Sequence, residues 1–312
     1  FNVSLMKLTD VDTYSGITLK EKRYDEKIYG GEKRWMRFEV PVSDFVNKIS
    51  VLGVYVDSHN EIEESDEENN ELRPPLVIGP DIVINDINIS TGGNNLNVSV
   101  SIGNIGNISA CNFTVKFYLN SSIGVVNEAE EIVRRLAPGD ENERIINFSA
   151  HIESNKVYNI TILADSEEEV DEFNEDNNIK SKRIGPDIVV KNVSKIPVYP
   201  VIGLTKNKIS VTVENEGEIA AENFNISFKF NFTYLDANKN VARANETIKK
   251  GNISLGPHEA RNLTLEWNPP SKYVVNLPYY DTYITVEADP DMIIEELDEK
   301  NNIFADESSW RI

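Results

Sequence analysis

The chain has 312 residues and a formal net charge of −21, from 52 acidic and 31 basic side chains. Hydrophobic residues make up 40% of it, which supports packed cores and excludes a disordered acidic tail. The acidity disfavours nucleic acid as a partner, and no apolar run approaches the roughly 18 residues of a membrane span, so we expect no membrane insertion of this segment. The single cysteine, Cys111, excludes an intrachain disulfide and leaves a free thiol or an intermolecular link open.

One acidic segment of fourteen residues occurs three times. Each copy begins with Asp, has an aliphatic residue sixth, acids seventh and eighth and Glu eleventh, and ends with Asn-Asn; the copies are 57–70, 165–178 and 289–302, called here acidic loops 1, 2 and 3. Such a recurrence indicates tandem domains of one kind. We expect three domains, which span residues 1–79, 80–185 and 186–312.

The first domain is expected to be incomplete. Residues 1–7 match the third strand of the later repeats, so the counterpart of residues 79–112, two whole strands, is absent. Residues 29–40 match a later strand, which favours a core position for Trp35. A chain that opens on Phe in this way is expected to be a processed or truncated product. Its open sheet edge then needs strands from elsewhere, either from a longer chain or from a neighbouring subunit.

The second domain reads as short alternating segments separated by turn residues, after a Gly-Pro pair that marks its start. Six or seven such strands in one repeat predict a β-sandwich. The expected strands are 81–90, 96–102, 112–119, 143–150, 157–164 and 179–184, with a weaker one near 123–133. The segment nearest to a helical pattern is 127–136, which we expect to form one helical turn at most.

The third domain repeats the same order after the Gly-Pro pair at 185–186. Longer hairpins at 230–248 and 268–276 are expected to account for its extra length. Trp267 falls beside the strand that carries Phe148 in the second domain, and this favours a core position. The whole chain is therefore predicted to be all-β, with three tandem immunoglobulin-like sandwiches, of which the first lacks its two N-terminal strands.

This pattern resembles the CARDB family, the cell-adhesion-related domain of bacterial and archaeal surface proteins. The resemblance rests on the opening GPDIVI at 79–84, on the Asn-x-Gly turns at 104–106 and 215–217, and on the closing acidic loops. It implies an immunoglobulin-like sandwich of about seven strands, displayed outside the cell and non-catalytic. The chain departs from the family pattern in its incomplete first repeat and in its many glycosylation sequons.

Fourteen Asn-x-Ser/Thr sequons are present, roughly three times the number expected by chance. In twelve of them the middle residue is apolar, so on a strand the Asn and Ser or Thr would face solvent while the middle residue enters the core. This favours N-glycosylation of an exported protein over an accident of polar strand faces. The candidate sites are Asn2, Asn88, Asn97, Asn107, Asn112, Asn120, Asn147, Asn159, Asn192, Asn225, Asn231, Asn245, Asn252 and Asn262.

The acidic loops suggest calcium, which binds several oxygen ligands. They are not EF-hands, because an aliphatic residue stands where that loop needs Gly and Asn replaces the last Glu. Two interpretations stay open: a hairpin whose acids face water, with no cofactor, or weak Ca²⁺ sites. The candidate ligands are Asp57, Glu63, Glu64, Asp165, Asp171, Glu172, Asp289, Glu295 and Glu296.

The sequence gives no support to an enzyme, since no nucleophile elbow, phosphate loop or paired metal-ligand spacing occurs. The function expected is that of a structural component of a cell-surface filament or surface layer, glycosylated and extracellular. Its partners would be N-linked glycans and other copies of the chain, joined head to tail, or further repeats of a longer tandem chain. The alternative is an adhesin stalk or a carbohydrate-binding ectodomain. The lack of glutamine, together with abundant Ile, Glu and Lys, suggests a heat-adapted source. The resemblance to CARDB surface proteins makes an archaeal source the expected one.

Overall fold

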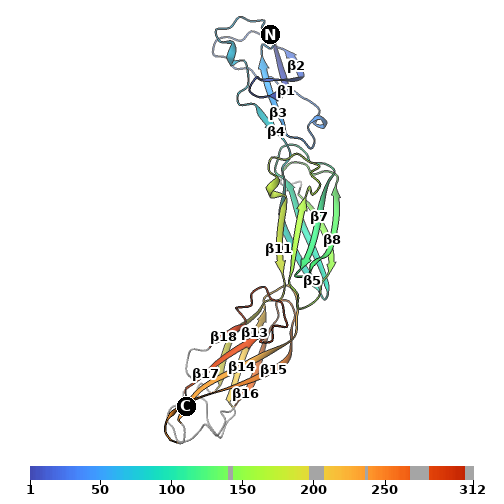
Figure 1. Ribbon diagram of the computed structural model, residues 1–312. Coiled ribbons are helices and arrows are strands. Elements are labelled where there is room, and N and C mark those ends of the chain that lie inside the picture. Colours follow the sequence, from blue (N-terminus) through green and yellow to red (C-terminus); the bar gives the residue numbers. More distant parts are fainter. Residues whose placement is uncertain (140–142, 197–206, 236–237, 268–280, 306–312) are drawn as a thin grey trace.

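The computed structural model describes residues 1–139, 143–196, 207–235, 238–267 and 281–305. In these ranges the chain forms β-strands and short 3₁₀ turns, arranged as three bodies in an elongated row (Figure 1). The strands make five antiparallel sheets, which confirms the all-β architecture of tandem immunoglobulin-like domains. The division at residues 79 and 185 stays a prediction, and we call the three ranges domains 1, 2 and 3. None of the helical turns in the described residues has the length or the apolar character to cross a membrane.

Domain 2 is a sandwich of two sheets with strand orders β5-β6-β9 and β11-β10-β7-β8. Its strands are β5 (Ile82–Gly92), β6 (Asn95–Asn104), β7 (Phe113–Ser121), β8 (Gly124–Val133), β9 (Arg144–His151), β10 (Tyr158–Ala164) and β11 (Ile179–Ile184). Alternate side chains enter one core, in which Phe117 and Ile160 are fully buried. All seven expected segments are confirmed as strands. The helical turn expected within 127–136 is wrong, because most of this segment pairs with β7 as the edge strand β8.

Domain 3 repeats the sandwich with orders β12-β13-β16 and β15-β14-β17-β18. Its strands are β12 (Ile188–Ile196), β13 (Asn207–Asn215), β14 (Ala221–Leu235), β15 (Val241–Leu255), β16 (Ala260–Trp267), β17 (Asp281–Ala288) and β18 (Ile303–Ala305). The β14–β15 hairpin confirms the longer hairpin expected at 230–248, whereas 268–276 lies outside the described residues. Trp267 is buried, as expected, and stacks on Phe230 with ring centroids 4.1 Å apart.

Domain 1 contains a single sheet of order β2-β1-β3-β4, the counterpart of β8-β7-β10-β11. Its strands are β1 (Asn2–Asp10), β2 (Ser15–Arg23), β3 (Ser50–Val56) and β4 (Leu76–Ile78). Residues 29–40 form no strand, and Trp35 is 97% exposed, so the core position expected for this side chain is wrong. The reason is the missing partner: the matching strand β9 pairs with β6, and the described part of domain 1 has no counterpart of β6.

The inner face of the domain 1 sheet is only partly covered: Val3 and Leu5 are 6% and 9% exposed, but other inward residues are more open than their counterparts. Val56 is 36% exposed, while its counterpart in domain 2, Ala164, is 1% exposed. The aliphatic sixth residue of acidic loop 1, Ile62, is 42% exposed, whereas Val170 and Ile294 in loops 2 and 3 are each 2% exposed. In domains 2 and 3 the counterparts of these residues lie in a core that includes a second, three-stranded sheet, and the described residues of domain 1 contain no such sheet.

Candidate functional site: the acidic loops at the domain joints

The first Asp of each acidic loop shapes the loop through its own backbone. Asp165 accepts hydrogen bonds from the backbone N–H groups of Glu169 and Val170 at 2.9 and 3.1 Å. Asp57 and Asp289 accept from N–H groups at the same two offsets. All three aspartates have a left-handed φ of 45–49°, a conformation that Asp adopts more readily than most residues. The hairpin interpretation therefore explains this position of the motif.

The eighth residue of loops 2 and 3 is a buried glutamate that binds the first strand of its own domain. The carboxylate of Glu172 accepts from the backbone N–H of Ile82 and, at 3.0 Å, from the amide of Asn178. The carboxylate of Glu296 accepts from the N–H of Ile188 at 2.7 Å. Each glutamate thus satisfies a donor at the beginning of a domain with an acceptor near its end.

Two further contacts complete this attachment. Asn177 donates through its side-chain amide to the carboxylate of Asp81 at 2.8 Å, and the backbone N–H of Phe173 donates to the carbonyl of Pro80 at 3.1 Å. Loop 3 holds residues 186–188 by the same two contacts, at 2.7 and 2.9 Å. We call the glutamate, the asparagine and the backbone N–H together the strand clamp. Its ligand is the tripeptide Pro-Asp-Ile that opens each of these domains.

Acidic loop 1 carries the same clamp without a ligand. The loop is folded like the others, since Glu67 accepts from the backbone N–H of Glu64 at 2.8 Å, as the eleventh glutamates of loops 2 and 3 do. Within the described residues, however, no hydrogen bond reaches the carboxylate of Glu64, the side chain of Asn69 or the N–H of Ser65. The clamp of domain 1 is therefore formed and open.

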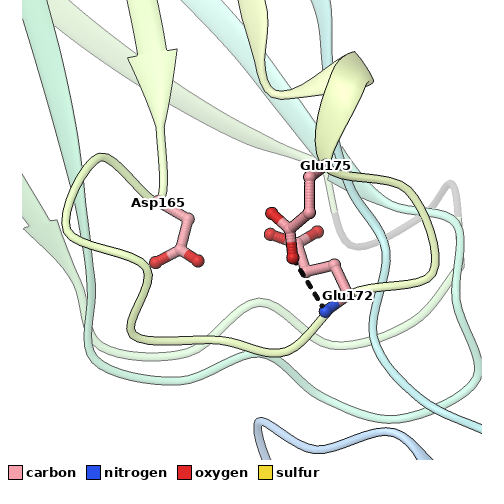
Figure 2. Close-up of side chains that lie close together, drawn as sticks. All are labelled: Asp165, Glu172 and Glu175. Atoms are coloured by element: carbon pink, nitrogen blue, oxygen red, sulfur yellow. Dashed lines mark hydrogen bonds between the residues drawn. The ribbon is translucent and has the colours of Figure 1, made fainter.

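Three carboxylates converge in loop 2. One oxygen each of Asp165, Glu172 and Glu175 lies within 4.8 Å of the others, as Figure 2 shows. Burial raises the pKa of Glu172 to about 8, and the two neighbouring carboxylates add to the rise, while the donors Ile82 and Asn178 oppose it. Burial also raises the pKa of Asp165. The cluster therefore favours a proton or a cation close to Glu172.

The donor set fits a hard divalent cation, because it offers carboxylate oxygens and no sulfur or imidazole. Of the nine candidate ligands, the structure brings Asp165 and Glu172 together and adds Glu175, which sequence reasoning had placed in the motif but not among the ligands. Within the described residues, loop 2 alone gathers three carboxylates this closely. The candidates in loops 1 and 3 stay predictions. The seventh-position Glu295 faces domain 2, where it accepts from Lys156 and from the N–H of Val157 at 3.4 and 3.3 Å.

Acidic loops 2 and 3 also form hydrogen bonds with the preceding domain. At the first joint, Asn47 accepts from the backbone N–H of Cys111 at 2.7 Å and donates to its carbonyl at 2.6 Å. The carbonyl of Asn47 accepts from the N–H of Asp171 at 3.1 Å. At the second joint, Asn155 makes the same pair with Glu222, at 2.6 and 2.9 Å, and its carbonyl accepts from Glu295 at 3.1 Å.

Apolar contacts repeat at the joints as well. Ile108 of domain 2 joins Phe45 and Ile78 in one cluster, and Ile219 of domain 3 joins the core of domain 2. Both isoleucines are almost fully buried, at 9% and 2% exposure. The two joints therefore share the same polar contacts, and each buries one isoleucine of the following domain.

The fourteen candidate glycosylation sites all lie at the surface. On the sheet β5-β6-β9, Asn88 stands opposite Ser99, which stands opposite Asn147, so sequons of neighbouring strands share one outer face. The middle residues Val98 and Phe148 point inward and are buried, as the strand geometry predicted. Asn2, Asn120, Asn159 and Asn225 are half-buried, and the other ten are exposed.

The buried glutamate of loop 3 should make stability depend on pH. Burial raises the pKa of Glu296 to about 8, from 4.5 in the unfolded chain, so the folded chain binds this proton more tightly. The stability that the group contributes is then lost as the pH rises from about 4.5 to about 8. Glu296→Gln has no proton to lose, so its stability should not show this loss. In thermal melts with EDTA, the free energy of unfolding of the variant minus that of the wild type should therefore increase as the pH rises across this interval. A difference between the two proteins that is constant with pH would contradict this, and the exposed Glu68→Gln should track the wild type.

Comparisons with solved structures find several similar chains. A CARDB domain from Pyrococcus furiosus, solved by crystallography in complex with di-metal ions, is 24% identical and aligns with a TM-score of 0.29, covering 34% of this chain and 93% of its own. A solution NMR structure of a CARDB domain from the same organism is 22% identical, with a TM-score of 0.28, and covers 35% of this chain and 95% of its own. Red sea bream transglutaminase aligns at 11% identity and a TM-score of 0.35, over 66% of this chain and 29% of the enzyme. No curated protein matches.

The model of the CARDB family matches twice, over residues 76–182 and 185–306. These ranges contain both complete sandwiches, their strand clamps and the Asn-x-Gly turns that carried the resemblance. CARDB domains occur in surface proteins and are in general non-catalytic. Because its two matches span most of the sequence, the chain belongs to the CARDB family.

Proposed function

We propose that this protein is a non-catalytic structural component of an extracellular cell-surface assembly, of filament or surface-layer type. Its units associate head to tail, and the first domain is completed by strands that a neighbour supplies. The two joints carry this proposal, because Asn47 and Asn155 dock on the next domain through the same contacts. A row of domains joined by the same hydrogen bonds is suited to an assembly with a constant step.

A second candidate is an adhesin stalk or a carbohydrate-binding ectodomain. A groove on domain 1 that Trp35, Tyr24 and Glu71 help to line supports this alternative, since aromatic rings and carboxylates are groups that bind sugars. We favour the structural role because the groove coincides with the position of missing strands. The sheet face that it exposes is buried in domains 2 and 3.

Negative-stain images of native material should show elongated rows in which three-body units follow one another with a constant spacing. The expected reason is that an open first domain exposes apolar surface and unpaired strand edges, which are unfavourable in a free monomer. Intact mass of the same material gives the length of the polypeptide. Dispersed single units of uniform length would contradict the assembly and leave the ectodomain candidate.

Glycosylation should be spread over all three domains. Every candidate Asn is exposed or half-buried, so glycopeptide mass spectrometry of protein from the native source should find sugar on several of the fourteen sites. Asn88, Asn97 and Asn147 crowd one sheet face, and we expect partial rather than full occupancy there. Unmodified peptides at all fourteen sites would refute the glycoprotein assignment.

Calcium should raise the melting temperature through acidic loop 2. A ligand at tenfold excess over its Kd adds roughly 1.4 kcal/mol to the free energy of unfolding, and extracellular calcium modules bind at about 10⁻⁴–10⁻³ M. Replacing Asp165 and Glu172 by Asn and Gln should remove most of the response, while the matched pair Asp289→Asn and Glu296→Gln should remove less, since loop 3 gathers no such cluster among the described residues. A melting temperature indifferent to calcium and to EDTA would leave the loops a purely structural role.

A further inference from the structure

We propose that the chain associates side by side with a second copy of itself, through antiparallel pairing of the edge strand β8 of one copy with the edge strand β15 of the other. The two strands hold the same place in their domains, since each is an outermost strand of a four-stranded sheet, beside β7 in domain 2 and beside β14 in domain 3. This contact is lateral, and it does not depend on the head-to-tail association proposed above.

Both strands have an open side. Within the described ranges β8 pairs with β7 alone and β15 with β14 alone, so the backbone groups along their other side meet no partner strand. The strands are long, at 10 and 15 residues, and neither contains a proline that would block pairing. Residues 127–133 and 241–250 keep one register with their inner neighbours, without a bulge. Regular edges of this kind are templates for the addition of a further strand.

The two edges carry opposite charge. Strand β8 has three glutamates and no basic residue, whereas β15 has one arginine, two lysines and one glutamate. The described ion pairs of the two strands use Glu131 and Lys249. Glu128, Glu130 and Arg243 are exposed and form no ion pair within the described ranges. Opposite charges favour the encounter of β8 with β15, and like charges disfavour pairing of either strand with its own copy.

One register matches the apolar side chains as well as the charges. Exposed residues alternate with more buried ones along both strands, so each strand has one outer face. In an antiparallel pair with Glu130 opposite Arg243, the next outer residue of β8 is Ile132, which lies opposite Val241. These two side chains are 60% and 71% exposed in the single chain, and the pairing would cover them. A parallel pair with the same charge contact would place Ile132 opposite Asn245, so the apolar match selects the antiparallel arrangement.

The other side chains near the contact are compatible with this register. On the inner face Ala129 lies opposite Ala244, and these small side chains already pack against the cores of their own domains. Asn245 is a candidate glycosylation site on the outer face of β15. Its side chain stands roughly perpendicular to the sheet, so a sugar there leaves the backbone groups at the open side able to pair.

The same two chains can make this contact twice. In Figure 1, β8 and β15 both lie on the right-hand side of their domains, which follow each other in the row. A neighbour that runs in the opposite direction brings its domain 3 beside domain 2 and its domain 2 beside domain 3. The association is therefore isologous and ends at a two-fold dimer.

The test is a charge swap at the centre of the register, in the full chain produced without glycosylation. Sedimentation velocity over a concentration series should show a dimer of the wild type. Glu130→Arg and Arg243→Glu each place like charges opposite one another at both contacts, and each should weaken the dimer at least about tenfold. An equimolar mixture of the two variants should regain the dimer, because every contact in the mixed pair again joins opposite charges.

A matched control lies on the opposite edge of the same sheet. Lys182→Glu reverses an exposed charge on β11, and the dimer should be unchanged. All three variants should keep the melting temperature of the monomeric domains, since none of the replaced side chains forms an ion pair in the described part of the chain.

Four outcomes would overturn the proposal. They are a wild type that stays monomeric up to about 100 μM, a dimer that tolerates both single charge reversals, a mixture of the two variants that does not reassociate, and a dimer weakened by Lys182→Glu, which would place the partner of β8 on β11. The head-to-tail assembly is tested separately. Rows in native images together with a failed charge swap would reject the lateral dimer and keep the structural function, and a dimer that obeys the swap without rows would do the reverse.

Discussion

The hydrogen bond from the backbone N–H of Ile82 to the buried carboxylate of Glu172 is the constraint on which each complete domain depends. The backbone N–H of the first strand residue is not bonded to a neighbouring strand, and a buried N–H group needs an acceptor. The acceptor comes from the loop before the last strand, so this bond ties the two ends of the domain together. Glu296 and Ile188 repeat it at 2.7 Å in domain 3. The Gly-Pro-Asp opening and the acidic loop are therefore two halves of one structural element.

The first residues of each complete domain also pack closely against the linker from the preceding domain. The linker carbonyl of Gly79 passes so close to Gly106 that a Cβ there would lie 2.5 Å from the oxygen, and the second joint is tighter, at 2.0 Å from the carbonyl of Gly185 to a Cβ on Gly217. Only glycine fits such an approach. The neighbouring Asn104 uses both ends of its amide on backbone groups, including the N–H of Asp81 at 3.1 Å. The linker is thus packed against Gly106 or Gly217, and Asn47 and Asn155 add hydrogen bonds between the domains that it joins.

The sequence predicted well whatever depends on local periodicity and on repetition. Alternating segments located every strand of domain 2, and they placed the sequon asparagines at the surface, although Ser109 and Thr114, which complete the sequons of Asn107 and Asn112, are buried. It failed for Trp35, because burial of a side chain depends on a strand partner far away in the chain. It also missed Asn155, whose partners are backbone groups of residues 222 and 295, and a backbone partner leaves no trace in residue types. The equal spacing of Asn47 and Asn155 from their acidic loops was the one available signal.

A structural clamp and a cation site are compatible in acidic loop 2. A carboxylate oxygen that accepts one hydrogen bond keeps a second lone pair, so Glu172 can hold Ile82 and still offer an oxygen to an ion. An ion beside the cluster would favour the ionised form of Glu172, and that form is the better acceptor for the N–H of the first strand. Loop 2 also receives Asn47 through the N–H of Asp171, one residue before this glutamate. Proton or cation binding there would therefore affect both the closure of domain 2 and its joint with domain 1. In a chain of net charge −21, a bound proton or cation would also reduce the repulsion between carboxylates at this joint.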